Sequence, residues 1–320
     1  MKNSQDNVEV SVIIVNFHTF FYTCSAVKSF IENARGFSYE IIIVDNSCDK
    51  EECRKLTQHF INNRKITVID SGSNLGFGKG NNLGVKYSHG EFLYLLNEDT
   101  LMLNNACLPL LIALKKSATI GLVTSNLYSP DKKPTSSFDS KKQTIRRLKY
   151  RCSFANFIIT RIFKRDSTSF NFSNKEKEIE GFAITASSLI RKSDFEEIGG
   201  FDKDIFLYSE DVLLCYMIMH KLGKKIISVP NSKVIHYEGA ADNLKNTSLF
   251  KARAAMHSFF VYYNKVYGPK TAIKALKIER HYHSKAKFFY TLFRKKEHVK
   301  SQNNYLLAID EEIKENENRI

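Results

Sequence analysis

The segment 91–99, with the sequence EFLYLLNED, constrains the fold of this chain more than any other. Five apolar residues lead directly into Asn97, Glu98 and Asp99, where the chain turns. A short apolar run between polar residues is typical of a parallel strand buried on both faces. Because ligands of an open α/β sheet bind at the carboxyl ends of its strands, we predict that these acids belong to a binding site.

Three further runs have the same character and also end in polar residues. They are short and β-branched, and they cover 10–16, 40–45 and 66–70. Helical patterns separate the strands, at about 19–33, 51–63, 78–88 and 104–117. Strands alternating with helices of this length predict right-handed βαβ units. The expected fold is therefore α/β, a Rossmann-like, mostly parallel sheet flanked by helices, in which four strand ends meet at one crevice. We expect a further strand at 180–190.

Length and composition limit the remaining possibilities. A chain of 320 residues with 43% hydrophobic content can form one large α/β domain and an appendage. Residues 1–9 are polar, which differs from a signal segment, and no apolar run is long enough to cross a membrane. We therefore expect a cytoplasmic protein. The six cysteines form no C-x-x-C pair, which argues against a zinc ribbon or a redox dithiol.

The net charge of +14 is concentrated in two segments. Residues 131–165 contain 11 Lys and Arg against 2 Asp, which gives +9, and residues 251–300 contain 13 against 2 Glu, which gives +11. The rest of the chain then sums to −6, so its predicted catalytic part is mildly acidic. This distribution favours two local attachment surfaces over a generally cationic protein.

The segment 272–296 mixes aromatic and aliphatic residues with Lys and Arg, and it has two interpretations. Such a helix can lie in an anionic membrane interface, which would make the protein peripheral at the cytoplasmic face of the inner membrane. It can also pack on the catalytic domain and leave a basic face in solvent. No helix-turn-helix, zinc-finger or RNP-type signature accompanies the charge, so we expect no nucleic-acid partner. The last twenty residues are polar, and we expect a frayed helix or disorder there.

Six segments, in this order, resemble the nucleotide-sugar glycosyltransferases of family 2, especially their rhamnosyltransferase-like branch: VSVIIVNF, EIIIVDNS, NLGFGKGNNLG, FLYLLNEDT, GGFDKDIFLYSEDV and VIHYEG. The resemblance covers roughly residues 8–240, and six ordered segments make chance agreement improbable. It implies a GT-A fold over 1–240, with a basic insertion at about 129–175. A helical, basic C-terminal region with a polar tail would then occupy 241–320.

The resemblance also implies a divalent metal, Mg²⁺ or Mn²⁺. The segment 97–99 matches the family's Asp-x-Asp-type motif in its Asn-x-Asp form, which makes Asp99 a metal ligand. His236, in the segment VIHYE, would be a second ligand, although a lone histidine is more often structural. Carboxylate oxygen suits both ions, and an imidazole favours Mn²⁺. The metal would act as a Lewis acid on the diphosphate.

Glu210 and Asp211 match the family's Glu-Asp motif, whose Asp is the expected base. One carboxylate near the anomeric carbon suffices for an inverting, single-displacement reaction. Asp211 is therefore the predicted base, and Glu210 a neighbour that binds acceptor or raises the pKa of Asp211. The alternative is that both acids only stabilise the N-terminus of a helix.

The resemblance assigns the nucleotide-sugar donor to strand ends and to the glycine-rich segment. The residues concerned are Val15, Asn16, Asp45, Asn46, Ser47, Asn74, Gly76, Phe77, Gly80, Asn81, Asn82, Asn97 and Glu98. The glycine spacing does not fit the dinucleotide fingerprint G-x-G-x-x-G, so an NAD enzyme is not expected.

The chain departs from the family pattern in three places. Glu98 stands where a Pro is frequent, which should leave the metal ligand intact, and His18 stands where a second Asn is frequent, so contacts with the base or ribose can differ. Leu213 and Met217 stand where an Asp and an Arg are usual, which suggests that a charge pair has been replaced by apolar packing. The favoured function is transfer of a sugar, rhamnose from dTDP-rhamnose first, to a glycan or polyprenyl-diphosphate-linked acceptor in surface polysaccharide synthesis. A UDP-hexose or UDP-galactofuranose-type donor is one alternative. A non-catalytic homologue that binds nucleotide sugar is the other.

Overall fold

The computed structural model describes residues 8–153, 156, 169–238 and 247–317. The chain divides into two compact units, the first made of 1–141, 168–202 and 211–242, the second of 142–167, 203–210 and 243–320. Segments 142–167 and 203–210 thus group with the C-terminal helices, although the sequence prediction placed them within 1–240. Part of the predicted basic insertion, residues 154–155 and 157–168, lies outside the described residues.

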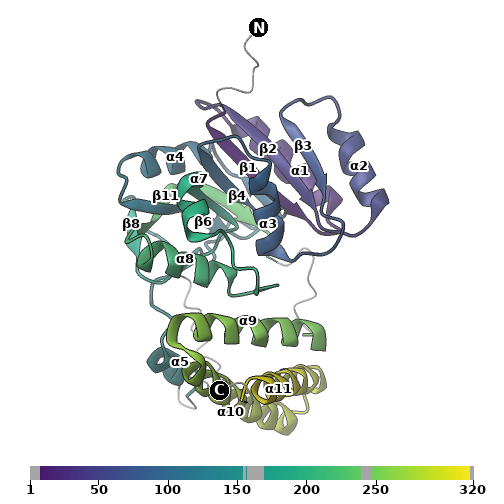
Figure 1. Ribbon diagram of the computed structural model, residues 1–320, viewed down its shortest axis with the longest axis vertical. Helices are drawn as coiled ribbons and strands as arrows, with labels where there is room; N and C mark the ends of the chain where they lie inside the picture. The colour runs from purple at the N-terminus through teal and green to yellow at the C-terminus, as the bar shows by residue number, and fades with distance from the viewer. Residues whose placement is uncertain (1–7, 154–155, 157–168, 239–246, 318–320) are drawn as a thin grey trace. The chain divides into compact units, whose positions relative to one another are not determined.

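The first unit is built on a nine-stranded sheet with the order β3-β2-β1-β4-β10-β6-β11-β5 and with β8 paired to β11 (Figure 1). Its strands are β1 (Val10–Asn16), β2 (Tyr39–Asp45), β3 (Ile66–Asp70), β4 (Phe92–Leu96), β5 (Thr100–Met102), β6 (Ile120–Tyr128), β8 (Lys177–Ile179), β10 (Ser187–Arg191) and β11 (Lys225–His236). β7 (Phe138–Asp139) and β9 (Phe182–Ala183) form a separate pair. Pairs β1–β2, β1–β4, β2–β3 and β6–β11 are parallel.

Alternating side chains of the central strands bury both faces of this sheet. In β1, Val12 and Ile14 join one hydrophobic cluster and Ile13 joins the other. The first cluster includes side chains of α1 (Phe20–Asn33), α2 (Lys50–Phe60) and α4 (Cys107–Lys115). The second includes side chains of α3 (Phe77–Lys86), α7 (Lys192–Ile198) and α8 (Glu210–His220). Since strands with both faces buried need apolar residues at every position, the continuous apolar runs are explained. The predicted α/β fold with a mostly parallel sheet is confirmed.

The carboxyl ends of the first four strands meet at one edge of the sheet, as predicted. Asn16 lies opposite Asp45 in the parallel pair β1–β2, and Asp45 lies opposite Asp70 in β2–β3. β4 is parallel to β1 on the other side, which brings the segment 97–99 to the same edge. The sheet thus gathers side chains that are far apart in the sequence.

The strand expected at 180–190 is wrong as a single element. The chain instead forms β9, turns through residues 184–186, and begins β10 at Ser187. β10 runs antiparallel between β4 and β6. Its antiparallel course follows from this turn, and the turn places Thr185 beside the sheet rather than within it.

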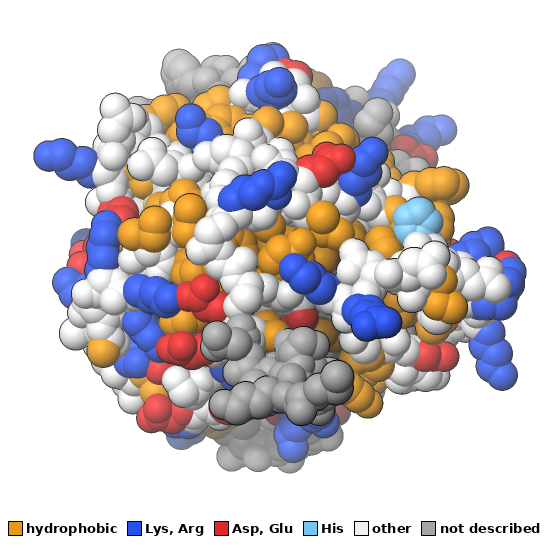
Figure 2. Space-filling model, turned by 90° about the horizontal axis from the view of Figure 1, so that it is seen from above, with side chains coloured by type: hydrophobic (Ala, Val, Ile, Leu, Met, Phe, Trp, Pro, Cys, Tyr) orange, Lys and Arg blue, Asp and Glu red, His pale blue; other side chains and the backbone are white. Residues whose placement is uncertain are grey.

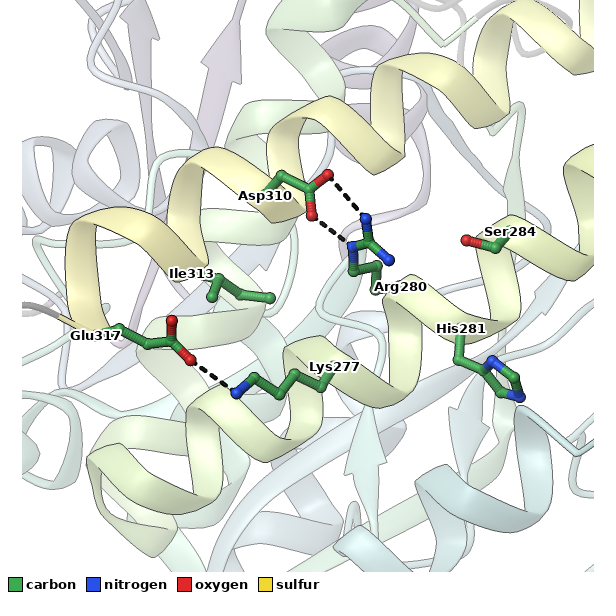
Figure 3. Close-up of a pocket in the computed structure, with 7 residues that line it drawn as sticks. All are labelled: Lys277, Arg280, His281, Ser284, Asp310, Ile313 and Glu317. Carbon is green, nitrogen blue, oxygen red and sulfur yellow. Dashed lines mark hydrogen bonds and ion pairs between the residues drawn. The ribbon is translucent and has the colours of Figure 1, made fainter.

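The second unit is helical, with α5 (Ile145–Arg151), α9 (Leu249–Tyr267), α10 (Pro269–Leu292) and α11 (Lys296–Glu317). α9, α10 and α11 pack against one another. Figure 3 shows two ion pairs that join α10 to α11, Lys277–Glu317 at 2.7 Å and Arg280–Asp310 at 2.6 Å. The expectation of a frayed or disordered tail is therefore wrong through residue 317, because α11 buries Ala308 and Ile309 in this bundle.

The surface seen from above carries no large patch of one charge. In Figure 2, Lys and Arg side chains are scattered among uncharged and hydrophobic ones, with Asp and Glu between them. Among the residues that the structure describes, no helix is both long and apolar enough to cross a membrane.

Candidate active site

Asp99 and His236 meet at the carboxyl end of β4. Oδ1 of Asp99 lies 3.2 Å from Nε2 of His236, and both side chains are buried. The antiparallel pair β5–β11 sets this geometry, since His236 lies opposite Thr100 and the N–H of Tyr237 donates to the carbonyl of Asp99 at 3.0 Å. The structure thus brings together the two predicted metal ligands, which are 137 positions apart in the sequence.

Burial and neighbouring charges shift the pKa values of Glu98 and His236. Burial, together with the charge of Asp99, raises the pKa of Glu98 to about 8. Glu98 is therefore mostly protonated at neutral pH and can donate a hydrogen bond. Burial lowers the pKa of His236, but the hydrogen bond and charge of Asp99 outweigh it, so the pKa is raised overall. The charge of Glu238, two residues on, acts in the same direction.

The donor atoms here fit a divalent cation that also binds substrate. Nε2 of His236 is the ring nitrogen that faces Asp99, and Oδ1 of Asn97 is buried with no hydrogen-bond partner among the described residues, so the Asn97 oxygen is available. The described part of the chain contains no group of three or more His, Cys, Asp or Glu that can hold a metal by itself. Mg²⁺ characteristically takes one or two carboxylates and completes its shell with water and substrate phosphates. A site with Asp99 and His236 is therefore consistent with a metal bound together with a diphosphate.

Asp211 is the second residue of α8, and Thr185 holds its carboxylate. The Thr185 hydroxyl donates to Oδ1, and the backbone N–H of Thr185 lies 3.3 Å from Oδ2. Burial raises the pKa of Asp211 to about 6, while these hydrogen bonds and the charge of His236 oppose the rise. The charge of His236 therefore acts on Asp211 as well as on Asp99. A carboxylate with this pKa is ionised at neutral pH and still basic enough to accept a proton.

Glu210 and the two residues before α8 belong to the second unit. Glu210 begins the helix but groups with the second unit, so the described geometry of the site is that of Asp211 alone. Tyr208 and Ser209, which precede the helix, both have positive φ angles, 68° and 64°. Left-handed backbone at two consecutive non-glycine residues is strained.

The residues predicted to bind the base and ribose are held to one another at the ends of β1 and β2. Nδ2 of Asn16 donates to Oδ1 of Asp45 at 2.8 Å, and the Ser47 hydroxyl donates to the same oxygen at 2.6 Å. The hydroxyls of Thr19 and Thr23 donate to Oδ1 of Asn16. Because this network is buried, it fixes the shape of the crevice wall, and little of each side chain is left for a ligand.

The glycine-rich segment turns into α3 against the same wall. Nδ2 of Asn46 donates to the carbonyl of Gly76 at 2.9 Å, and Oδ1 of Asn74 accepts from the N–H of Gly76 at 3.0 Å. A Cβ on Gly80 would lie 2.9 Å from Cγ1 of Val15, so the glycine permits a close approach of α3 to β1. Asn81 is buried and donates to the carbonyl of Phe77 at 3.0 Å within the helix.

Asn82 is hydrogen-bonded to the backbone of Phe201. Its amide donates to the carbonyl of Phe201 at 2.7 Å and accepts from the Phe201 N–H at 2.9 Å. Both hydrogen-bonding ends of the side chain are thus used by the backbone of residue 201. Asn82 anchors this segment, and a contact with the donor stays a prediction.

Three residues that bear on the site were missed from the sequence. Thr185 lies within the strand that was predicted at 180–190, and its actual position follows from the turn between β9 and β10. A hydrogen bond with the Thr19 side chain lowers the pKa of Glu98 and so opposes the effect of burial on that pKa. Glu238 lies in the segment VIHYEG, which carries part of the family resemblance. Its position two residues after the predicted ligand His236 could have indicated that it belongs to the site.

Comparison with known proteins identifies the family. The model of the family described as "Glycosyl transferase family 2" matches residues 11–199, which is more than half of the chain. The chain belongs to glycosyl transferase family 2. This family 2 glycosyltransferase is 26% identical over 221 residues to rhamnosyltransferase WbbL of Escherichia coli K12, covering 66% of this chain and 78% of that protein. It is 25% identical over 214 residues to the low-salt glycan biosynthesis hexosyltransferase Agl10 of Haloferax volcanii, covering 65% of this chain and 61% of that protein.

Solved structures support the GT-A fold of this family 2 enzyme. GalNAc-T7 with UDP, GalNAc and Mn²⁺ superposes with a TM-score of 0.56 at 17% identity, over 81% of this chain and 51% of that one. Mannosyltransferase PcManGT from Pyrobaculum calidifontis, in complex with GDP-Man and Mn²⁺, superposes with a TM-score of 0.51 at 13% identity, over 96% of this chain and 87% of that one. The chain thus spans about half the length of GalNAc-T7.

Proposed function

We propose that this protein is an inverting, metal-dependent glycosyltransferase that moves one sugar from a nucleotide-diphosphate donor, with dTDP-rhamnose favoured, to a glycan or polyprenyl-diphosphate-linked acceptor. The observation that carries the proposal is the buried contact of 3.2 Å between Asp99 and His236, the two predicted metal ligands, with the charge of His236 acting on Asp211. Such a pairing of an ionised base with a metal-binding group is what the reaction requires, because nucleophile activation and leaving-group stabilisation must act on one carbon.

In the proposed reaction, Asp211 accepts the proton of an acceptor hydroxyl whose oxygen forms a bond to the anomeric carbon of the sugar. The bond from that carbon to the diphosphate oxygen breaks, and the nucleoside diphosphate leaves with the electron pair. Asp99 and His236 would hold Mg²⁺ or Mn²⁺, which when bound supplies Lewis-acid stabilisation of the leaving diphosphate. Thr185 orients the base, and the network around Asn16 and Asp45 shapes the wall against which the nucleotide is proposed to bind.

Several relatives support a role in surface polysaccharide synthesis. WbbL is named a rhamnosyltransferase, and a protein of Myxococcus xanthus that is 23% identical over 217 residues is named for O-antigen biosynthesis. The similar structures contain UDP or GDP-mannose, so a UDP-hexose or UDP-galactofuranose-type donor is the second candidate. We propose a cytoplasmic location, with which the six free cysteines agree because a reducing compartment keeps thiols unpaired.

Calorimetric titration of dTDP, UDP and GDP, with and without Mn²⁺, tests the proposal. The wild type should bind one of them in a metal-dependent manner, and Asp99→Ala should abolish that dependence. Asp70→Ala is the matched control, because Asp70 also ends a parallel strand at this edge but is exposed and is no proposed ligand. Failure of every nucleotide to bind would contradict the proposal and favour a degenerate homologue.

A further inference from the structure

One face of α10 is left uncovered by its own helical bundle. The helix buries Ala272, Leu276 and other residues against α9 and α11. Another face carries a stripe with helical spacing, made of Lys274, Lys277, His281, Lys285, Phe288 and Leu292, in which Lys277 lies at the border with α11 and pairs with Glu317. Residues three or four apart lie on one face of a helix, so the stripe is continuous along α10. The first four residues are basic, and the last two are apolar.

The basic end of this stripe borders a hollow of about 400 Å³. Lys149 of α5 faces the hollow together with Lys274, Lys277 and Lys285 of α10, and His281 is also in its wall. None of the described residues that line it is acidic. Figure 3 shows that Lys277 pairs with Glu317 and Arg280 with Asp310 between α10 and α11, so these two cations of α10 are neutralised within the unit. This end therefore presents a concave, positively charged surface contributed by two separate elements.

The other end of the stripe is an exposed apolar tip, consisting of Phe288, Leu292 and Phe293. Their side chains are 74%, 68% and 56% exposed, in that order. The ring of Phe289 lies 4.5 Å from that of Phe293 and supports it from the helix. Leaving three large apolar side chains in water is unfavourable, so a cluster of them usually marks an interaction surface.

Cations surround this apolar tip. Residues 285–300, which include the turn into α11, contain six Lys and Arg and a single acid, Glu297. Within the described structure, Arg294, Lys295 and Lys296 make no ion pair, and all three are exposed. The tip thus combines apolar side chains with positive charge that its own unit does not neutralise.

We propose that this face of α10, from Lys274 to Phe293, docks on the surface of an anionic phospholipid bilayer. The tip would enter the interface between headgroups and acyl chains, while the lysines contact the headgroup phosphates. Long Lys and Arg side chains can keep their charged ends in the headgroup layer while their stems lie along apolar surface. A second copy of the chain fits this face less well, because a symmetric contact would place like charges against each other. The proposal does not depend on the proposed sugar transfer.

Flotation of the full-length protein with lipid vesicles tests this proposal. Vesicles of phosphatidylcholine alone are compared with vesicles that also contain phosphatidylglycerol, each at low and high salt. The wild type should float with the anionic vesicles, and salt should weaken the binding. A tip variant, Phe288→Ser/Leu292→Ser/Phe293→Ser, should bind at least about tenfold more weakly. Lys274→Gln/Lys285→Gln should lose the preference for anionic lipid.

Matched controls separate this effect from a general loss of surface residues. Phe250→Ser removes a phenylalanine of α9 that is 62% exposed and outside the stripe, and Lys55→Gln/Lys86→Gln removes two exposed cations of the first unit. Both controls should bind vesicles like the wild type. Nucleotide binding by the tip variant should also match the wild type, which distinguishes this proposal from the proposed function.

Three outcomes would overturn the proposal. The first is a wild-type protein that does not float with anionic vesicles, and the second is a tip variant that floats as well as the wild type. The third comes from sedimentation analysis without lipid. A wild-type dimer that the tip variant converts to a monomer would show that a second copy covers the tip.

Discussion

The hydroxyl of Thr185 donates a hydrogen bond to Oδ1 of Asp211, and the backbone N–H of the same residue lies 3.3 Å from Oδ2. One residue therefore fixes both oxygens of the proposed base. Hydrogen bonds to a carboxylate favour its charged form, so this contact opposes the effect of burial on the pKa of Asp211. Thr185 is thus a positioning residue with a measurable electrostatic effect.

Thr185→Val should move the acid limb of the pH–rate profile to higher pH. The substitution removes one hydrogen bond to the charged form, so the pKa of Asp211 should rise above its value of about 6. Activity depends on the ionised base and is lost as pH falls through that pKa. The measurement is kcat/KM as a function of pH. Thr185→Ser keeps the hydroxyl and should restore the wild-type profile, whereas identical profiles for Val and wild type would refute the assignment.

Asp211→Asn should abolish transfer and stabilise the fold at neutral pH. The folded-state pKa of Asp211 is raised from 3.8 to about 6, so ionisation destabilises the folded state. The unfavourable effect is absent below pH 3.8 and complete above about pH 6. The asparagine can still accept from the Thr185 N–H, and the gain should be at most about 3 kcal/mol. Urea unfolding at pH 8 and at pH 4 measures it, and an equal difference at both values would contradict the pKa argument.

Gly80→Ala should displace α3 and weaken nucleotide binding. A Cβ at this position would lie 2.9 Å from Cγ1 of Val15 and 3.2 Å from Nδ2 of Asn46. Overpacking of this kind costs about 1–3 kcal/mol of stability. Adding Val15→Ala removes the closest atoms and should recover part of the loss. Denaturant unfolding of both single variants and the double variant gives the coupling energy, and strict additivity would argue against a direct clash.

Leu213→Asp should destabilise the protein strongly, and Met217→Arg should partly rescue it. Leu213 is buried on α8, and Met217, one turn later, packs on the second hydrophobic cluster. A buried charge without a partner costs about 3–5 kcal/mol. An arginine four residues on, at the next turn of the helix, can form an ion pair with the introduced carboxylate. Unfolding free energies of the wild type, Leu213→Asp, Met217→Arg and the double variant measure the rescue. A separate Leu213→Asn variant distinguishes the effect of charge from that of polarity.

The local patterns of this chain predicted its first four strands and the helices between them. Strands such as 40–45 are continuous apolar runs because both faces of the sheet are covered, and this property is visible in the sequence. The turn at residues 184–186 was not predicted, because Gly181–Ile190 satisfies a strand pattern throughout and nothing local favours a break. The tail beyond residue 300 is polar, and its helix depends on packing against α9 and α10.

The sequence by itself therefore determined the first four strands, the helices that alternate with them, and the position of Asp99 after a buried strand, because periodicity and strand-end chemistry are local properties. Only the tertiary structure decided which distant side chains lie beside Asp99 and Asp211. The pairing of β5 with β11 places His236 against Asp99, and the turn before β10 places Thr185 on Asp211. Both contacts depend on strand order and direction, which are set by long-range packing. For the same reason, only the tertiary structure decided which face of α10 is buried in its bundle and that Phe288 and Leu292 stay exposed.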